Sequence, residues 1–430
     1  MKDGIVTSKN GDDVMTKLDL FTMALGIEEP WYIKEIKFDQ NVSKQLDIYV
    51  EFKKGSKFYY KDEELAIDGY FKAHDTVEKT WQHLSFFEYR CFIHAKMPKI
   101  YPKKGTTKII KGPWEGVMKG FTLMFEALLL QLAQNMPVSK VSRLVGTYDV
   151  KIWGMIRKYA KAGIDLNDYA ELEMFGVDET SKAKGHDYVT IFVDMKNKKT
   201  IYVTVGKDNK VITDFREELE NKNGKKENIK TVSSDMSKAF IKGVNREFIN
   251  AEIVFDKFHI MKAINDAVNQ VRIRESKTES ILKGSKYSIL KNKKNLTKKQ
   301  EKKLEEIKLS KIKLQTLKAI QIREAFQELY KIEELIEFEQ KLKEWYFWAT
   351  HCRIEEMKKI AKTIKEHWAG VVGYKKEKVT NALLEGFNSI IQMAKRRARG
   401  FKDLENFKAI IYLLTGKLQL EKINALYQPL

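Results

Sequence analysis

The feature that most constrains the fold is a change of sequence pattern between residues 174 and 275. Three runs rich in apolar and β-branched residues come first, MFGVDET, DYVTIFVDM and KTIYVTVG, and short polar turns separate them. Such runs predict three consecutive strands in an antiparallel meander. Helical periodicity then alternates with short apolar runs, in the order VITDFREELEN, IKTVSSD, MSKAFIKGVNREF, AEIVFD and HIMKAINDAVNQVRIRE. The predicted order of elements is therefore βββαβαβα.

This order is that of the ribonuclease H-like fold, so we expect an α/β protein with a mixed sheet of this kind. Asp178 ends the first predicted strand and Asp235 ends the fourth, and these strands are neighbours in that topology. Carboxylates that meet at one sheet edge repel each other unless a cation lies between them. Hard oxygen ligands favour Mg²⁺ or Mn²⁺, and two such ions support phosphodiester chemistry. We predict a two-metal site.

The third carboxylate of such a site has to come from a helix packed on the sheet. Glu385 is the best candidate, because it begins the predicted helix LLEGFNSIIQMAKRRARGF, which Thr380 or Asn381 can cap. Further along this helix lie cations that we expect to hold the backbone of a nucleic acid, namely Lys395, Arg396, Arg397 and Arg399. An ordinary solvated helix face is the competing interpretation.

Other acidic residues compete for the same role. Glu179, Asp194 and Asp256 also lie at or beside the ends of predicted strands. Acidic residues at such positions often form turns, and Asp256 can instead cap the following helix. We interpret His259 as a packed or supporting residue rather than as a base.

Residues Trp31 to Ile110 predict a small β-rich module of short alternating strands broken by glycines. It contains His74, His83, Cys91 and His94, whose spacing matches no usual zinc motif, so we do not expect zinc. The sequence has two cysteines, which supports neither a disulfide framework nor a cysteine-rich zinc site and fits a reducing compartment.

Residues 121 to 163 have the rhythm of a helix-turn-helix. Pro137 opens a short helix that ends near Gly146, and Thr147 or Asp149 can cap a second helix that runs to about Ala162. Three cations lie on or near the second helix, where they can contact phosphates or base edges: Lys151, Arg157 and Lys158. The alternative is a plain three-helix bundle with surface lysines.

The segment from residue 276 to about 342 is lysine-rich and helical, and we interpret it as a helical insertion with a basic surface. Helices continue beyond it, with Trp345, Trp348 and Trp368 as expected core residues. The net charge of +20 favours a polyanionic partner, most often nucleic acid. The sequence has no apolar run long enough to span a membrane, and the residues MKDGIVTSKNGDD lack the apolar core of a signal peptide, so we expect a cytoplasmic protein that does not bind membranes.

These patterns divide the chain into five parts. They are a β-rich DNA-binding module (1–112), a helix-turn-helix domain (113–170), the first part of a ribonuclease H-like catalytic domain (171–275), a basic α-helical insertion (276–372) and a C-terminal helical part of the catalytic domain (373–430).

Four motifs, in this order, closely resemble the DDE transposases of bacterial insertion sequences, specifically the ISL3 group: GVDETSKAKGHDYVTIFVD, VSSDMSKAFIKGV, IVFDKFHIMKAINDAV and NALLEGFNSIIQMAKRRARGF. The resemblance runs from the helix-turn-helix to the C-terminus. It implies a catalytic triad of Asp178, Asp235 and Glu385 and a helical insertion in the catalytic domain. Members of the group commonly carry an N-terminal zinc ribbon with cysteine pairs. This sequence has no such pairs, so its N-terminal module resembles a degenerate ribbon.

The resemblance also implies a function. Such an enzyme binds the terminal inverted repeats of its own element, cuts the DNA strands with metal-activated water, and joins the freed 3′-hydroxyl ends to target DNA. It implies double-stranded DNA as the partner, a homodimer or higher assembly on DNA, and a bacterial, nucleoid-associated location. Two alternatives remain open: a catalytically inactive DNA-binding protein descended from a transposase, and a ribonuclease H-like nuclease.

Overall fold

The computed structural model describes residues 16–39, 44–181, 188–255, 257–310, 312–377 and 382–427. The chain divides into two compact units, one of Met1–Leu166 with Ile390–Leu430 and the other of Asn167–Ser389. The predicted domain 373–430 therefore coincides with neither unit. Three candidate ligand or capping residues, Asp256, Thr380 and Asn381, lie outside the described residues.

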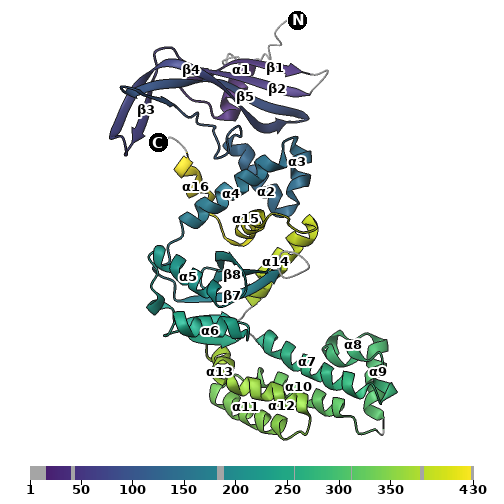
Figure 1. Ribbon diagram of the computed structural model, residues 1–430. Coiled ribbons are helices and arrows are strands. Elements are labelled where there is room, and N and C mark those ends of the chain that lie inside the picture. The colour runs from purple at the N-terminus through teal and green to yellow at the C-terminus, as the bar shows by residue number, and fades with distance from the viewer. Residues whose placement is uncertain are drawn as a thin grey trace, which may run out of the picture. The chain divides into compact units, whose positions relative to one another are not determined.

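The first unit begins with a helix and a six-stranded sheet (Figure 1). Its elements are α1 (Lys17–Leu25), β1 (Trp31–Asp39), β2 (Gln45–Phe52), β3 (Lys57–Asp62), β4 (Ile67–Phe86), β5 (Tyr89–Lys103) and β6 (Thr106–Ile109). The strand order is β1-β2-β5-β4-β3, with β6 on β5, and β2 runs parallel to β5. Because successive side chains of a strand point to opposite faces of the sheet, Leu46, Ile48 and Ile93 lie on one buried face. The predicted β-rich module is confirmed.

The helix-turn-helix follows as α2 (Leu123–Asn135), α3 (Val138–Val145) and α4 (Asp149–Asp165), which confirms the predicted pair of helices. Gly146 ends α3 with φ +66°, a left-handed conformation that glycine adopts at little cost. The residue before α4 is Tyr148, and its side chain makes no capping hydrogen bond. The predicted cap by Thr147 or Asp149 is therefore wrong.

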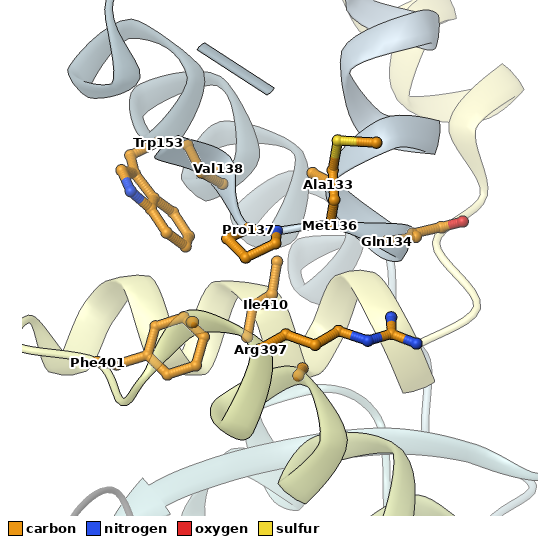
Figure 2. A pocket seen from close by; sticks show the side chains of 11 residues that line it. Ala133, Gln134, Met136, Pro137, Val138, Trp153, Arg397, Phe401 and Ile410 are labelled. Atoms are coloured by element: carbon orange, nitrogen blue, oxygen red, sulfur yellow. The ribbon is translucent and has the colours of Figure 1, made fainter. Parts of the chain in front are cut away.

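Helices from the end of the chain pack on this three-helix group. They are the last turns of α14 (Ala382–Ala398), then α15 (Leu404–Thr415) and α16 (Leu420–Tyr427). A small pocket of about 30 Å³ lies between the two sets of helices, and Figure 2 shows Trp153 and Phe401 at one side of it. These rings meet edge to face at 6.1 Å between centroids. The buried Tyr159 of α4 donates its hydroxyl hydrogen to Asn424 of α16 at 2.8 Å.

The second unit contains a five-stranded mixed sheet in the order β11-β10-β7-β8-β9. Its elements are β7 (Met174–Ser181), β8 (Tyr188–Asp194), β9 (Lys199–Val205), α5 (Lys210–Asn221), β10 (Thr231–Ser234), α6 (Lys238–Glu247), β11 (Glu252–Phe255) and α7 (Lys257–Glu275). β7, β8 and β9 are antiparallel, whereas β10 pairs in parallel with both β7 and β11. The predicted order βββαβαβα is confirmed.

Helices follow the sheet in the second unit, and α10, α11 and α12 lie close together in Figure 1. Their bounds are α8 (Lys286–Leu290), α9 (Lys298–Leu309), α10 (Gln315–Leu329), α11 (Leu335–Thr350), α12 (Glu355–Glu366) and α13 (Trp368–Glu377). Trp345 is buried and donates to the Ile322 carbonyl at 2.8 Å, as expected for a core residue. Trp348 is 37% exposed, so its prediction as a core residue is wrong. None of the described helices is long and apolar enough to cross a membrane.

Candidate active site

Asp178 and Asp235 lie at the same level on two neighbouring parallel strands. Ser233 of β10 is paired with Gly176 of β7, and each aspartate comes two residues after its member of this pair. Asp235 directly follows the last residue of β10, as predicted, whereas β7 continues past Asp178 to Ser181. The pairing of the strands therefore brings the two predicted carboxylates together in the sheet.

The environment of Asp178 opposes its ionisation. Burial raises the pKa of its carboxyl group to about 6, and the negative charges of Asp235 and Glu179 act in the same direction. The Glu179 amide donates to Asp178 Oδ1 at 2.7 Å, and this bond and the nearby His259 act to lower that pKa. Carboxyl groups whose pKa is raised by burial and by neighbouring acids are typical of functional sites, where a bound cation offsets the repulsion.

Helix α14 packs its first turns against β7. Leu384 is buried, and a Cβ atom on Gly176 would lie 2.8 Å from Leu384 Cδ1, so the Leu384 side chain packs directly over the backbone of Gly176. One turn further on, Asn388 Nδ2 donates a hydrogen bond to Asp178 Oδ2. Glu385 is exposed and precedes Asn388 by three residues, which places both on the same side of the helix. The predicted third carboxylate is thus on the helix that contacts Asp178.

The carboxylates of Asp178 and Asp235 offer hard oxygens, which are the donor atoms that Mg²⁺ and Mn²⁺ favour. The Asn388 amide oxygen is buried and has no hydrogen-bond partner within the described part of the chain. The described residues contain no group of three acidic, histidine or cysteine side chains close enough to hold a metal ion. The donor chemistry fits a divalent cation, while the described residues form no closed three-carboxylate cluster.

The competing acidic residues have other surroundings. Asp194 accepts hydrogen bonds from the Lys196 and Asn197 amides, both at 2.9 Å, and so forms the turn after β8. It lies opposite Phe175, toward the start of β7. Glu179 is half-buried, and burial raises its pKa while Lys207 acts to lower it. Glu179 therefore remains the nearer alternative, because its charge also interacts with Asp235.

The predicted DNA-binding cations of α4 differ in their contacts. Arg157 Nη1 donates to Asn406 Oδ1 at 2.7 Å, and Lys158 Nζ donates to the Val117 carbonyl at 3.2 Å. Lys151 is exposed, with its Nζ 5.8 Å from the centroid of the Phe121 ring. Two of the three cations thus hold parts of the first unit together.

The cations at the end of α14 also differ in their contacts. Arg397 Nη1 donates to the Asn135 carbonyl at 3.0 Å, and Figure 2 shows its side chain among the residues that line the pocket. Lys395 is partly buried, and burial is the main cause of its lowered pKa. Arg396 and Arg399 are exposed, and Arg399 has φ +57° at the end of the helix.

The histidines considered for zinc have hydrogen-bond or stacking partners in the first unit. His94 lies between Asp47 Oδ1 at 2.7 Å and Thr80 Oγ1 at 2.9 Å. His83 Nδ1 lies 2.8 Å from Thr122 Oγ1, and burial lowers the pKa of His83 to about 4. His74 stacks on Tyr101, and burial raises the pKa of the Cys91 thiol to about 12.

Several residues in or near the candidate sites were not singled out from the sequence. The spacing of three residues from Glu385 could have indicated that Asn388 lies on the same side of the helix. An asparagine on a helix usually faces solvent, however. Tyr148 and Val150 lie at the start of α4 and are 77% and 71% exposed, which no residue pattern predicted. Gln82 donates to the Val145 carbonyl at 2.8 Å and so holds the end of α3, a contact that the sequence does not reveal.

Comparison with known proteins adds independent information. The sequence model of a family described as "Transposase", of the DDE type and the ISL3 group, matches residues 175–411. A second model, described as "Helix-turn-helix domain of transposase family ISL3", matches residues 119–160. The chain is 26% identical over 347 residues to the transposase for insertion sequence element IS1001 of Bordetella parapertussis, covering 78% of this chain and 84% of the relative. It is 23% identical over 371 residues to the transposase for insertion sequence element IS1557 of Mycobacterium tuberculosis, covering 78% and 81%.

Proposed function

Because this chain belongs to the ISL3 family of transposases, we propose that it binds the terminal inverted repeats of an insertion sequence and catalyses metal-dependent cleavage and transfer of DNA strands. The observation that carries the proposal is the placement of Asp178 and Asp235 at one level of adjacent parallel strands. Helix α14, which contacts Asp178, also carries Glu385. Membership of the family alone implies a transposase. The placement of these acidic residues supports metal-dependent cleavage and transfer of DNA strands.

The sheet supports a ribonuclease H-like catalytic core. Its central strand β7 has an antiparallel neighbour on one side and a parallel neighbour on the other, and β9 and β11 form the edges. In such a mixed sheet, acidic residues from the two central parallel strands meet where a helix can add another ligand. Asp178, Asp235 and α14 occupy these positions.

The carboxylates of Asp178 and Asp235 would hold Mg²⁺ or Mn²⁺, and Glu385 would complete the site. When bound, two such ions activate a hydroxyl nucleophile and stabilise the leaving oxygen of a phosphodiester. Asp178 is prepared for this role, because burial and Asp235 raise its pKa and so favour binding of a cation. Asn388 orients its carboxylate. Water and the 3′-hydroxyl of DNA serve as the successive nucleophiles, so no covalent enzyme intermediate is needed.

The helix-turn-helix would read the terminal repeats through the start of α4. The first residues of a recognition helix enter the major groove, where apolar side chains contact thymine methyl groups. Tyr148 and Val150 expose most of their surface there, and Lys151 is an exposed cation beside them. The hydrogen bond from Gln82 to Val145 connects the sheet to the end of α3. The N-terminal sheet thereby supports the reading helix.

Exposed cations would bind the DNA backbone. Arg396 and Arg399 at the end of α14 are exposed, and the lysine-rich helix α9 carries further positive charge. These contacts position DNA without reading its sequence. Joining two ends in one reaction requires two end-binding surfaces, so a homodimer or higher assembly would form on DNA.

The test is cleavage of a labelled duplex that carries the terminal repeat of the insertion sequence. The wild-type chain should cut the repeat and join it to a target plasmid in Mg²⁺. Glu385→Gln should bind the same duplex with unchanged affinity and reduce cleavage at least about 100-fold, because it removes a charged ligand. Glu405→Gln, which changes an exposed glutamate on α15, is the matched control and should cut normally.

Two outcomes would reject the proposal. Binding of the repeat without cleavage by the wild-type chain, in Mg²⁺ or Mn²⁺, would favour a catalytically inactive DNA-binding protein. Cleavage of branched or hybrid nucleic acid without selectivity for the repeat and without joining would favour a ribonuclease H-like nuclease. Normal cleavage by Glu385→Gln would place the third carboxylate at another residue, with Glu179 the next to test.

A further inference from the structure

A buried amide oxygen beside Asp178 has no hydrogen-bond partner in the described structure. Asn388 donates one hydrogen bond from Nδ2 to Asp178 Oδ2, and its other polar atom, Oδ1, is buried and unpaired among the described residues. A buried acceptor without a partner destabilises a protein, because it has lost its hydrogen bond to water. Such an atom is therefore informative when it lies next to a candidate site, because an absent ligand can satisfy it.

The position of Asn388 is fixed by the packing of α14. Leu384, one turn earlier, is 3% exposed and lies over Gly176 of β7. With the helix held there, the hydrogen bond to Asp178 sets the plane of the Asn388 amide. Because the amide nitrogen and oxygen share one carbon, the unpaired oxygen is a close neighbour of the Asp178 carboxylate.

The charges nearby favour a neutral ligand at this place. Asp178, Asp235 and Glu179 interact repulsively with one another. A fourth carboxylate would increase this repulsion in the metal-free protein, whereas an amide oxygen adds a hard donor atom without adding charge. The amide hydrogen also holds Asp178 in place, as supporting hydrogen bonds do for metal ligands in general.

We propose that Asn388 is a fourth residue of the active site and that its amide oxygen is a neutral ligand for the divalent cation held by Asp178 and Asp235. This assignment rests on the proposed function. Asn388 therefore has two roles, since its N–H group orients one carboxylate and its oxygen binds the same cation. A purely structural asparagine would use its N–H group alone.

Direct binding of Mn²⁺ tests the assignment without measuring activity. The metal-free full-length chain is titrated with Mn²⁺, and free Mn²⁺ is followed by electron paramagnetic resonance. Asn388→Leu, which removes both polar atoms, should weaken binding about 10–100-fold. Its melting temperature in EDTA should show that it remains folded. Ser389→Ala, at the exposed neighbouring position on α14, is the matched control and should bind like the wild type.

Asn388→Asp separates the two roles. It keeps an oxygen ligand but loses the N–H donor, so it should bind Mn²⁺ within about threefold of the wild type while Asn388→Leu does not. Equal, strong losses in both variants would show that only the N–H group matters and would overturn the ligand assignment. Wild-type binding by Asn388→Leu would overturn it too.

The same titration distinguishes failure of this assignment from failure of the proposed function. A wild-type chain that binds Mn²⁺ and cuts the terminal repeat, together with an Asn388→Leu variant that does both equally well, contradicts only the role of Asn388. A wild-type chain that neither binds Mn²⁺ nor cuts contradicts the metal-dependent function, and the assignment falls with it.

Discussion

Cations that look alike in the sequence have different roles at the scale of single residues. Arg157 and Lys158 were both expected to face DNA, yet each donates a hydrogen bond to another part of its own unit. Arg396 is exposed. The sequence predicts cations on a helix but not their partners, because Asn406 and Val117 are distant from α4 along the chain. Asn388 was missed for the same reason, since its partner Asp178 lies on another element.

This difference predicts opposite phenotypes for two arginines. Arg157→Ala should lower stability by about 1–3 kcal/mol, because it leaves a partly buried hydrogen bond to Asn406 unmade. Arg396→Ala should leave the melting temperature unchanged, weaken DNA binding at all sequences, and reduce the slope of log affinity against log salt by about 1. Thermal melting and salt-dependent gel shifts measure both effects. A stable Arg157→Ala variant with reduced DNA affinity would contradict the structural role.

At the scale of elements, local patterns predicted what local sequence determines. The order βββαβαβα and the two helices around Gly146 follow from periodicity and turn residues, and both are found. The parallel pairing of β2 with β5 and the packing of α15 and α16 on α4 were not predicted. These arrangements depend on contacts between distant segments, such as that of Tyr159 with Asn424, which leave no periodic signal.

One such contact predicts that the stability of the first unit depends on pH. Glu126 of α2 is fully buried and accepts hydrogen bonds from the Val117 and Met118 amides, and its Oε2 lies 2.9 Å from the Tyr159 hydroxyl oxygen. Burial raises its pKa to about 7, above the usual 4.5. Between these values the folded state binds a proton that the unfolded state has lost. The stability contributed by this proton is therefore lost as pH rises through about 7.

Glu126→Gln should remove this dependence. Both carboxyl oxygens accept a backbone amide hydrogen, so the glutamine leaves one of these amides without an acceptor and lowers stability by an amount that does not depend on pH. The free energy of unfolding of the wild type relative to the variant should therefore fall by up to about 3 kcal/mol from pH 5 to pH 8. The exposed Glu64→Gln change in the same unit is the control and should show no such pH-dependent difference. Melting curves from pH 5 to 8 measure the effect. A difference in stability between the wild type and Glu126→Gln that stays constant from pH 5 to pH 8 would contradict the raised pKa of Glu126.

At the scale of the whole molecule, sequence, structure and relatives indicate one kind of protein. The net charge of +20 suits a polyanionic partner, and both matched family models belong to ISL3 transposases. The boundary between the two compact units falls within α14, so this helix contributes Glu385 to one unit and Arg397 to the other. The sequence predicted both residues on one helix, but the assignment of its two ends to different units depends on tertiary packing.

The central claim is that Asp178 and Asp235 bind the divalent cation used to cut DNA, and a change of metal preference tests it most directly. Asp178→Cys and Asp235→Cys replace a hard oxygen ligand with a softer thiolate, which Mn²⁺ accepts better than Mg²⁺. We predict that the wild type cuts the terminal repeat in either metal, whereas each variant is inactive in Mg²⁺ and regains cleavage in Mn²⁺. Cleavage by the wild type without any divalent cation, or equal cleavage by the variants in both metals, would contradict the account.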